Sequence, residues 1–109
     1  MPIEKWSEKV AIVHLADDPQ FSDELESLAI ETKQKPMCVV LDFGGVHHVN
    51  SSNISQLLKL RKRTMATEQR MVLGAVGTQV WSVFLVTGLD KIFEFTDNVM
   101  LALATIQIS

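Results

Sequence analysis

The sequence has 109 residues, a typical length for one domain with a single hydrophobic core. Apolar residues make up 47% and charged residues 21%, which is the usage of a folded globular protein and excludes a disordered chain. The formal net charge of -3 disfavours nucleic acid as a partner, and no apolar run has the length of a membrane span. We expect one soluble domain over residues 1–109, in the reducing cytoplasm that the lone Cys38 also fits.

The first half of the chain alternates strand and helix patterns. Residues 9–15, KVAIVHL, alternate in a way that predicts a strand, with residues 3–6 as a short hairpin partner. A loop precedes a helix that Ser22 can cap and that Pro36 ends. The run MCVVLDF at residues 37–43 is continuously apolar, which predicts a central strand covered on both faces.

The second half of the chain repeats this alternation. A second helix is expected to bury an apolar stripe of four residues: Ile54, Leu57, Leu58 and Met65. Residues 71–76 predict another buried strand, and Thr78 begins a helix that Gly88 ends in a left-handed conformation. Residues 92–95 predict a short edge strand.

The last residues predict a terminal helix capped by Asp97 or Asn98. Strands and helices therefore alternate along most of the chain. This order predicts an α/β domain with right-handed crossovers, about four helices and a mixed, largely parallel sheet of four to five strands.

The densest polar stretch is HHVNSSNIS, residues 47–55, between the central strand and the second helix. His47 and His48 are sequence neighbours that point to opposite sides of an extended segment, so they make a poor pair of metal ligands. Ser51 or Ser52 with a histidine base would suit a hydrolase, but the G-x-S-x-G elbow is absent from this stretch. We expect no catalytic residue, no metal and no cofactor.

Asp17 and Asp18 follow the first long strand, and Asp42 lies at the end of the second, as the acidic pair and the phospho-acceptor of a receiver domain would. A receiver's acceptor loop and its later lysine are not evident, and the chain has one strand-helix unit too few. The pattern therefore disfavours a receiver.

The start of the second helix offers a further interpretation of the polar stretch. Asn50, Ser51 and Ser52 are each good N-cap residues, so an ordinary cap explains them. The unpaired amides and the dipole of a helix N-terminus also favour negative charge, and they would accommodate a phosphate on a serine. The stretch is either a simple cap or a cap that doubles as a phosphorylation switch.

The whole pattern resembles the STAS family, the fold of anti-sigma-factor antagonists and of the cytoplasmic tails of sulfate transporters. The resemblance covers most of the chain, through LDFGGV, HHVNSSNISQLLKL and MVLGAV. Its most specific part is VFLVTGLDKIFEF, which is similar to the family's late L-x-x-T-G-L-D-x-x-F signature. Leu89, Ile92 and Phe93 of this segment are expected to pack on the sheet.

In antagonist members the loop before the second main helix carries D-S-S-G, and a partner kinase phosphorylates the first serine. The resemblance implies that Ser51 is the phospho-acceptor and Ser52 a capping or supporting hydroxyl. Asn50 stands in place of the motif's aspartate, keeping an acceptor oxygen without its charge, and Asn53 adds a side chain where the motif has glycine. The other implied switch-loop and partner-binding residues are Asn50, Ser52, Asn53, Gln56 and Lys59.

The resemblance implies a non-enzymatic regulator that binds an anti-sigma factor with serine kinase activity and leaves it once Ser51 is phosphorylated. The alternative is a STAS scaffold or subunit of a signalling or transport assembly whose loop never accepts phosphate, which Asn50 and Asn53 favour. A remote alternative is a small hydrolase or metalloenzyme using the histidines and a serine. The basic run KLRKR, residues 59–63, fits a solvated helix face or a docking patch for an acidic partner. The pattern leaves the oligomeric state open.

Overall fold

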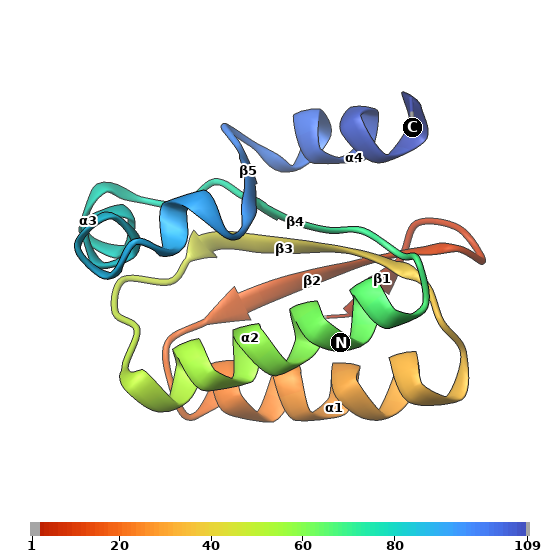
Figure 1. The fold of residues 1–109 in the computed structure, drawn as a ribbon, viewed down its shortest axis with the longest axis horizontal. Helices are drawn as coiled ribbons and strands as arrows, with labels where there is room; N and C mark the ends of the chain where they lie inside the picture. Colours follow the sequence, from red (N-terminus) through yellow and green to blue (C-terminus); the bar gives the residue numbers. More distant parts are fainter. Residues whose placement is uncertain (1–2, 109) are drawn as a thin grey trace.

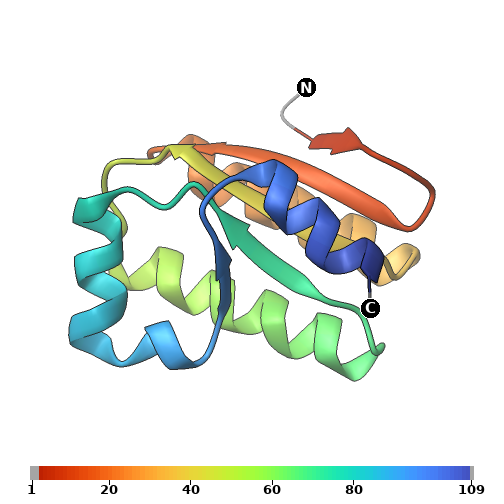
Figure 2. The ribbon, with the colours of Figure 1, turned by 90° about the horizontal axis from the view of Figure 1, so that it is seen from above.

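The computed structural model describes residues 3–108, which form one five-stranded sheet with four α-helices and one short 3-10 helix, η1 (Figures 1 and 2). The elements in chain order are β1 (Ile3–Lys5), β2 (Val10–Ala16), α1 (Gln20–Gln34), β3 (Cys38–Gly45), α2 (Ser51–Ala66), β4 (Met71–Gly74), α3 (Thr78–Thr87), η1 (Leu89–Lys91), β5 (Glu94–Thr96) and α4 (Val99–Ile108). The predicted alternation of strands and helices is confirmed.

The strands lie in the order β1-β2-β3-β4-β5, with β3 in the centre. β1 pairs with β2 in antiparallel orientation, and the other three pairings are parallel. β5 is a short edge strand that begins two residues later than expected. This arrangement confirms the mixed, largely parallel sheet and the central position of the apolar strand.

Helices cover both faces of the sheet (Figure 1). α1 and α2 lie side by side on one face, where Leu41 and Phe43 of β3 join the larger core. In this core the ring of Phe43 lies edge-on to Phe21 of α1 and Phe84 of α3, at centroid distances of 5.8 Å and 6.2 Å. α4 alone covers the other face, over a smaller core that includes Val40. The central strand is therefore buried on both sides.

The start of α1 differs from the prediction. The helix begins at Gln20, and its N-cap is Pro19, which makes no side-chain cap bond. Oδ1 of Asp18 accepts hydrogen bonds from the backbone N–H and the hydroxyl of Ser22, both at 2.8 Å. Ser22 was predicted as the cap, but it lies inside the first turn because the preceding carboxylate takes the free amide.

The buried face of α2 also differs in part from the prediction. The residues that face the core recur at helical spacing: Asn53, Leu57, Leu60 and Thr64. Leu57 is correctly predicted, and Ile54 is partly buried against the core. The predicted burial of Leu58 and Met65 is wrong, because both side chains lie on the outer side of the helix, where they are 37% and 56% exposed.

The segment after α3 follows the prediction with one exception. Gly88 takes a φ of 75° and ends the helix in the left-handed region that glycine tolerates. Leu89 and Phe93 are buried in the core as expected. Ile92 is 41% exposed, because the intervening turn of η1 points it away from the sheet. Its predicted packing is therefore wrong.

The terminal helix α4 begins after Asn98, whose Oδ1 accepts a hydrogen bond from the Leu101 N–H at 2.9 Å. Asn98 is thus the cap among the two predicted candidates. On the outer side of α4, Met100 is 71% exposed. None of the helices within residues 3–108 has the length and apolar character of a membrane span.

Candidate functional site at the start of helix α2

The predicted site residues lie where two loops meet at one edge of the sheet. β2 and β3 are parallel neighbours, so their carboxyl ends lie together, and each leads through a loop into a helix (Figure 1). The loop after β2 carries Asp17 and Asp18, and the loop after β3 carries the histidines and Asn50. Side chains from two distant parts of the sequence therefore share one crevice.

Asp17 holds the loop between β3 and α2. Its Oδ1 accepts hydrogen bonds from the backbone N–H groups of His47 at 2.7 Å and His48 at 3.1 Å, and Oδ2 lies 3.2 Å from Nδ1 of His47. The bonds from the His47 and His48 amides lower the pKa of Asp17 below its ordinary value. The two histidines thus contribute chiefly their backbone amides, which a carboxylate fixes.

Asp18 connects the same loop to the start of α2. Its Oδ2 accepts hydrogen bonds from the side-chain amides of Asn50 at 3.1 Å and Asn53 at 3.0 Å. Together with the bond from the Ser22 hydroxyl, which is the largest cause, these donors lower the pKa of Asp18 to about 2. The carboxylate is therefore ionised across the physiological range.

Asn50 and Asn53 form a capping box. Oδ1 of Asn50 accepts the Asn53 N–H at 2.8 Å, and Oδ1 of Asn53 accepts the Asn50 N–H at 3.1 Å. Asn53 is only 1% exposed, so its side chain points into the protein and adds no bulk to the surface. The cap is Asn50, and the capping role implied for Ser52 is wrong.

The outer side of the same turn carries hydroxyls. Ser51 and Ser52 are exposed, and neither hydroxyl has a hydrogen-bond partner within the described part of the chain. Gln56 is half-buried and donates from Nε2 to the Ser22 carbonyl at 3.3 Å, whereas Lys59 is exposed. Of the six predicted residues, Ser51, Ser52 and Lys59 face solvent, while the side chains of Asn50, Asn53 and Gln56 are held by the protein.

A cavity of about 220 Å³ lies beside the capping box, lined by Asp17, Asp18, His48, Val49, Asn50 and Asn53. Within residues 3–108, no group of three or more His, Cys, Asp or Glu side chains has the arrangement of a metal site. His47 is paired with Asp17 rather than with a serine. The Ser51 hydroxyl is thus exposed, and no base of residues 3–108 is hydrogen-bonded to it.

The sequence does not predict the role that Asp17 and Asp18 have in the site. The sequence suggested them only as magnesium-binding acids of a receiver, whereas the structure uses them as hydrogen-bond acceptors for the opposite loop. A signal was available, because two parallel strands that neighbour one another bring their following loops together. The polar residues of both loops could have been paired on that basis.

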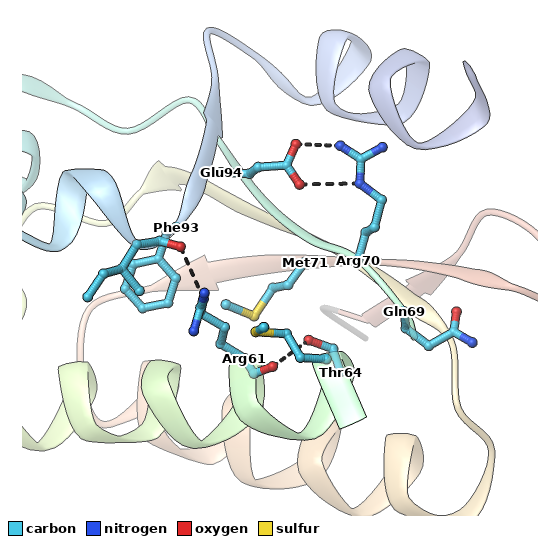
Figure 3. A pocket seen from close by; sticks show the side chains of 9 residues that line it. Arg61, Thr64, Gln69, Arg70, Met71, Phe93 and Glu94 are labelled. Carbon is cyan, nitrogen blue, oxygen red and sulfur yellow. Dashed lines mark hydrogen bonds and ion pairs between the residues drawn. The ribbon is translucent and has the colours of Figure 1, made fainter. Parts of the chain in front are cut away.

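The far end of α2 is built differently (Figure 3). A cavity of about 290 Å³ lies there between α2, β4 and β5, with Met71 and Phe93 in its wall. Nε of Arg61 donates to the Ile92 carbonyl at 3.1 Å, and Arg70 forms an ion pair with Glu94. These arginines hold β5 against the rest of the sheet, and none of the predicted site residues lies here.

Comparisons with known proteins identify the same fold. The STAS domain family model matches residues 8–102. Among solved structures, a Thermotoga maritima protein described as an anti-sigma factor antagonist is 15% identical, with a TM-score of 0.86 over 97% of this chain and 93% of that chain. A STAS domain protein from Planctomyces limnophilus is 20% identical, with a TM-score of 0.80 over 96% and 97%. Bacillus SpoIIAA in its phosphorylated form is 15% identical, with a TM-score of 0.69 over 87% and 89%.

These identities are low, so the structural matches support the fold rather than a specific activity. No curated protein matches the sequence significantly. The family match extends from just before β2 into α4, and it therefore includes both loops of the site.

Proposed function

The chain belongs to the STAS domain family, and from this membership we propose that it is a regulatory protein-binding module of the anti-sigma-factor antagonist type. In this proposal it acts in the cytoplasm, has no catalytic activity of its own and binds an anti-sigma factor with serine kinase activity. Phosphorylation of Ser51 then releases it. Several structural neighbours are described as anti-sigma factor antagonists, which supports the class of function.

The observation that carries the proposal is the presentation of Ser51. It is the first residue of α2, its side chain is exposed, and the preceding Asn50 is fixed by the capping box and by Asp18. A kinase would therefore meet a hydroxyl on a pre-ordered turn and would pay little ordering cost on binding. Ser52, one position later, is exposed in the same turn, which makes it a natural control.

A phosphate on Ser51 would have two opposite effects. Within the chain, its oxygens would lie at the helix N-terminus, where free amides and the dipole favour negative charge. Towards a partner, it would add a charge of about -1.5 to -2. The neighbouring Asp17 and Asp18 carboxylates are already ionised, as their lowered pKa values indicate. The docked surface would become strongly negative and the partner would dissociate.

Incubation of the protein with the anti-sigma kinase of its host and Mg-ATP tests this proposal. We expect mass spectrometry to locate one phosphate on Ser51. Ser51→Ala should abolish the modification, and Ser52→Ala should retain it. If the kinase binds but the unmodified chain alone is recovered, the phosphorylation switch is wrong. If the purified kinase does not bind at all, the antagonist function is wrong as well.

A second function is favoured by one observation in the same loop. The side-chain amide of Asn50 donates a hydrogen bond to Asp18. An aspartate at position 50, as in D-S-S-G, would therefore place two carboxylates against each other. This loop is therefore adapted to a neutral residue, which suits a STAS scaffold or subunit that is never phosphorylated. Recovery of a transporter component or a larger signalling assembly with the protein, and no kinase, would support the scaffold.

A further inference from the structure

The two helices on one face of the sheet carry opposite charges. α1 contains four carboxylates and one lysine, whereas α2 contains four cations and no carboxylate. Within the described residues, none of the α1 carboxylates lies within ion-pair distance of an α2 cation. The helix layer therefore presents an acidic strip beside a basic strip, without a direct ion pair between the two in residues 3–108.

Two hydrogen bonds define how these helices are aligned. Gln56 Nε2 donates to the Ser22 carbonyl at 3.3 Å, and Arg63 Nη1 donates to the Ala29 carbonyl at 2.8 Å. Both bonds join residues that are 34 apart in the sequence. α1 and α2 thus run parallel and side by side, as Figure 1 shows, with each α1 residue beside the α2 residue 34 positions later.

The outer surface of this layer also carries an apolar projection and a hollow. Ile30 of α1 is 57% exposed, with Glu26 one turn before it. On α2, a hollow of about 310 Å³ is lined by Lys59, Lys62, Arg63 and Ala66. The aliphatic stems of these basic side chains and the Ala66 methyl group make the hollow a suitable seat for a branched apolar side chain.

A second copy of this chain has both complementary parts. We propose that the α1–α2 face self-associates about a two-fold axis parallel to the helices, so that α1 of each copy lies over α2 of the other. Rotation about this axis does not shift residues along the helices, so each α1 residue again lies level with the α2 residue 34 positions later, now in the second copy. Glu26 therefore lies opposite position 60 of the second copy, between Lys59 and Lys62. Ile30 then lies opposite position 64, at the hollow beside Ala66. Each contact occurs twice, as a closed symmetric interface requires.

The size of this face indicates a weak dimer. A helix of this length spans about 22 Å, and two adjacent helices are about 20 Å wide, so each copy would bury about 450 Å². Stable interfaces bury about 800 Å² per partner, and smaller ones belong to transient complexes. Because Lys59 belongs both to this face and to the predicted partner-binding residues, self-association and partner binding would compete.

Sedimentation of the purified protein over a concentration series, from about 10 µM to about 1 mM, tests the dimer in the range where transient interfaces associate. At low ionic strength we expect the average mass to rise towards twice that of one chain. About 0.5 M salt should abolish the rise, because exposed charge pairs are screened. Ile30→Glu should also abolish it. The control Met100→Glu makes the same apolar-to-charged change at an exposed position of α4 and should leave the association unchanged.

A charge exchange tests the pairing itself. Glu26→Lys and Lys62→Glu should each weaken self-association about tenfold, because like charges then oppose each other twice. A mixture of the two variants should associate as well as the unaltered protein, since the mixed dimer restores both attractive pairs. This recovery needs no kinase, so its result is independent of the Ser51 proposal.

Three results would overturn the dimer. The first is a constant monomer mass at every concentration and salt. The second is association that Met100→Glu weakens and Ile30→Glu does not. The third is a monomer whose Lys62 and Arg63 amide NMR signals shift on addition of a polyglutamate peptide, which would assign the basic strip to a foreign acidic segment.

Discussion

The two sides of the first turn of α2 are built for different purposes. On the inner side, Asn53 and Asn50 exchange hydrogen bonds with each other and with Asp18, and Asn53 is buried. On the outer side, Ser51 and Ser52 are exposed and have no side-chain partner within residues 3–108. Stability therefore depends on the inner residues, which leaves the outer ones available for a partner. Substitutions on the two sides should have separable effects.

The largest effect is expected at Asn53. Asn53→Ala removes two hydrogen-bonding groups from a buried position: the side-chain oxygen that accepts the Asn50 backbone N–H, and the side-chain NH₂ that donates to Asp18. We therefore expect a loss of about 2 kcal/mol in the free energy of unfolding. Urea denaturation measures it, with Ser52→Ala as the control that should stay within about 0.5 kcal/mol. A loss at Asn53 no larger than the control's would contradict the structural role of the inner side.

A smaller loss is expected from Asn50→Asp, which introduces the aspartate of the D-S-S-G motif. Aspartate caps a helix as well as asparagine does, so the cap should remain. The bond to Asp18 is replaced by repulsion between carboxylates, and we expect a loss of about 1 kcal/mol at pH 7. Denaturation curves should show this loss shrinking as the pH falls and one carboxyl is protonated. An equally stable variant at pH 7 would show that Asp18 does not constrain position 50.

Acid titration should reveal the Asp18 network. Its pKa is lowered from 3.8 to about 2, so its bonds stabilise the fold above pH 4 and lose this effect as the pH falls towards 2. Asp18→Asn should therefore be less stable than the unaltered protein at pH 7, and the gap should close in acid. A gap that is constant from pH 7 to about pH 2 would contradict the role of the ionised carboxylate.

His14 of β2, which lies opposite Asp42 of β3, provides a contrast with the opposite pH dependence. Its ring nitrogens lie 3.0 Å from a Glu4 carboxylate oxygen and 2.7 Å from one of Asp42, and these bonds raise its pKa above 6.5. The stabilisation is complete below pH 6.5 and is lost as the pH rises through the raised pKa. The effect should be small because the side chain is 46% exposed. His14→Gln should remove this pH dependence of stability from unfolding curves. If the variant keeps the same pH dependence, a group other than His14 causes it.

The sequence was sufficient for the fold because its periodicities are strong. The continuous apolar run of β3, the alternation in β2 and the Gly88 helix end each have one local explanation, and each was correctly predicted. The predictions were wrong where a contact with another side chain, rather than the local pattern, determined the role of a residue. Ser22 lost its predicted capping role because Asp18 takes its amide.

The site was predictable in position but not in orientation. Ser51 at a helix start follows from local pattern, since serines and asparagines cluster before an apolar periodicity. That Asn53 would turn inward depends on Asp18, which is 35 residues away in the sequence. Local pattern carries no information on such a contact, and only the pairing of the two parallel strands brings these residues together.

The affinity of the protein for its anti-sigma kinase tests the switch most directly. Calorimetric titration should give comparable affinities for the unaltered protein and for Ser51→Ala, because Ser51→Ala leaves the inner network intact. Ser51→Glu should bind at least about tenfold more weakly, since it adds a negative charge near the ionised Asp17 and Asp18 carboxylates. Equal affinity of Ser51→Glu and the unaltered protein, with both folded, would contradict a phosphorylation switch at this serine.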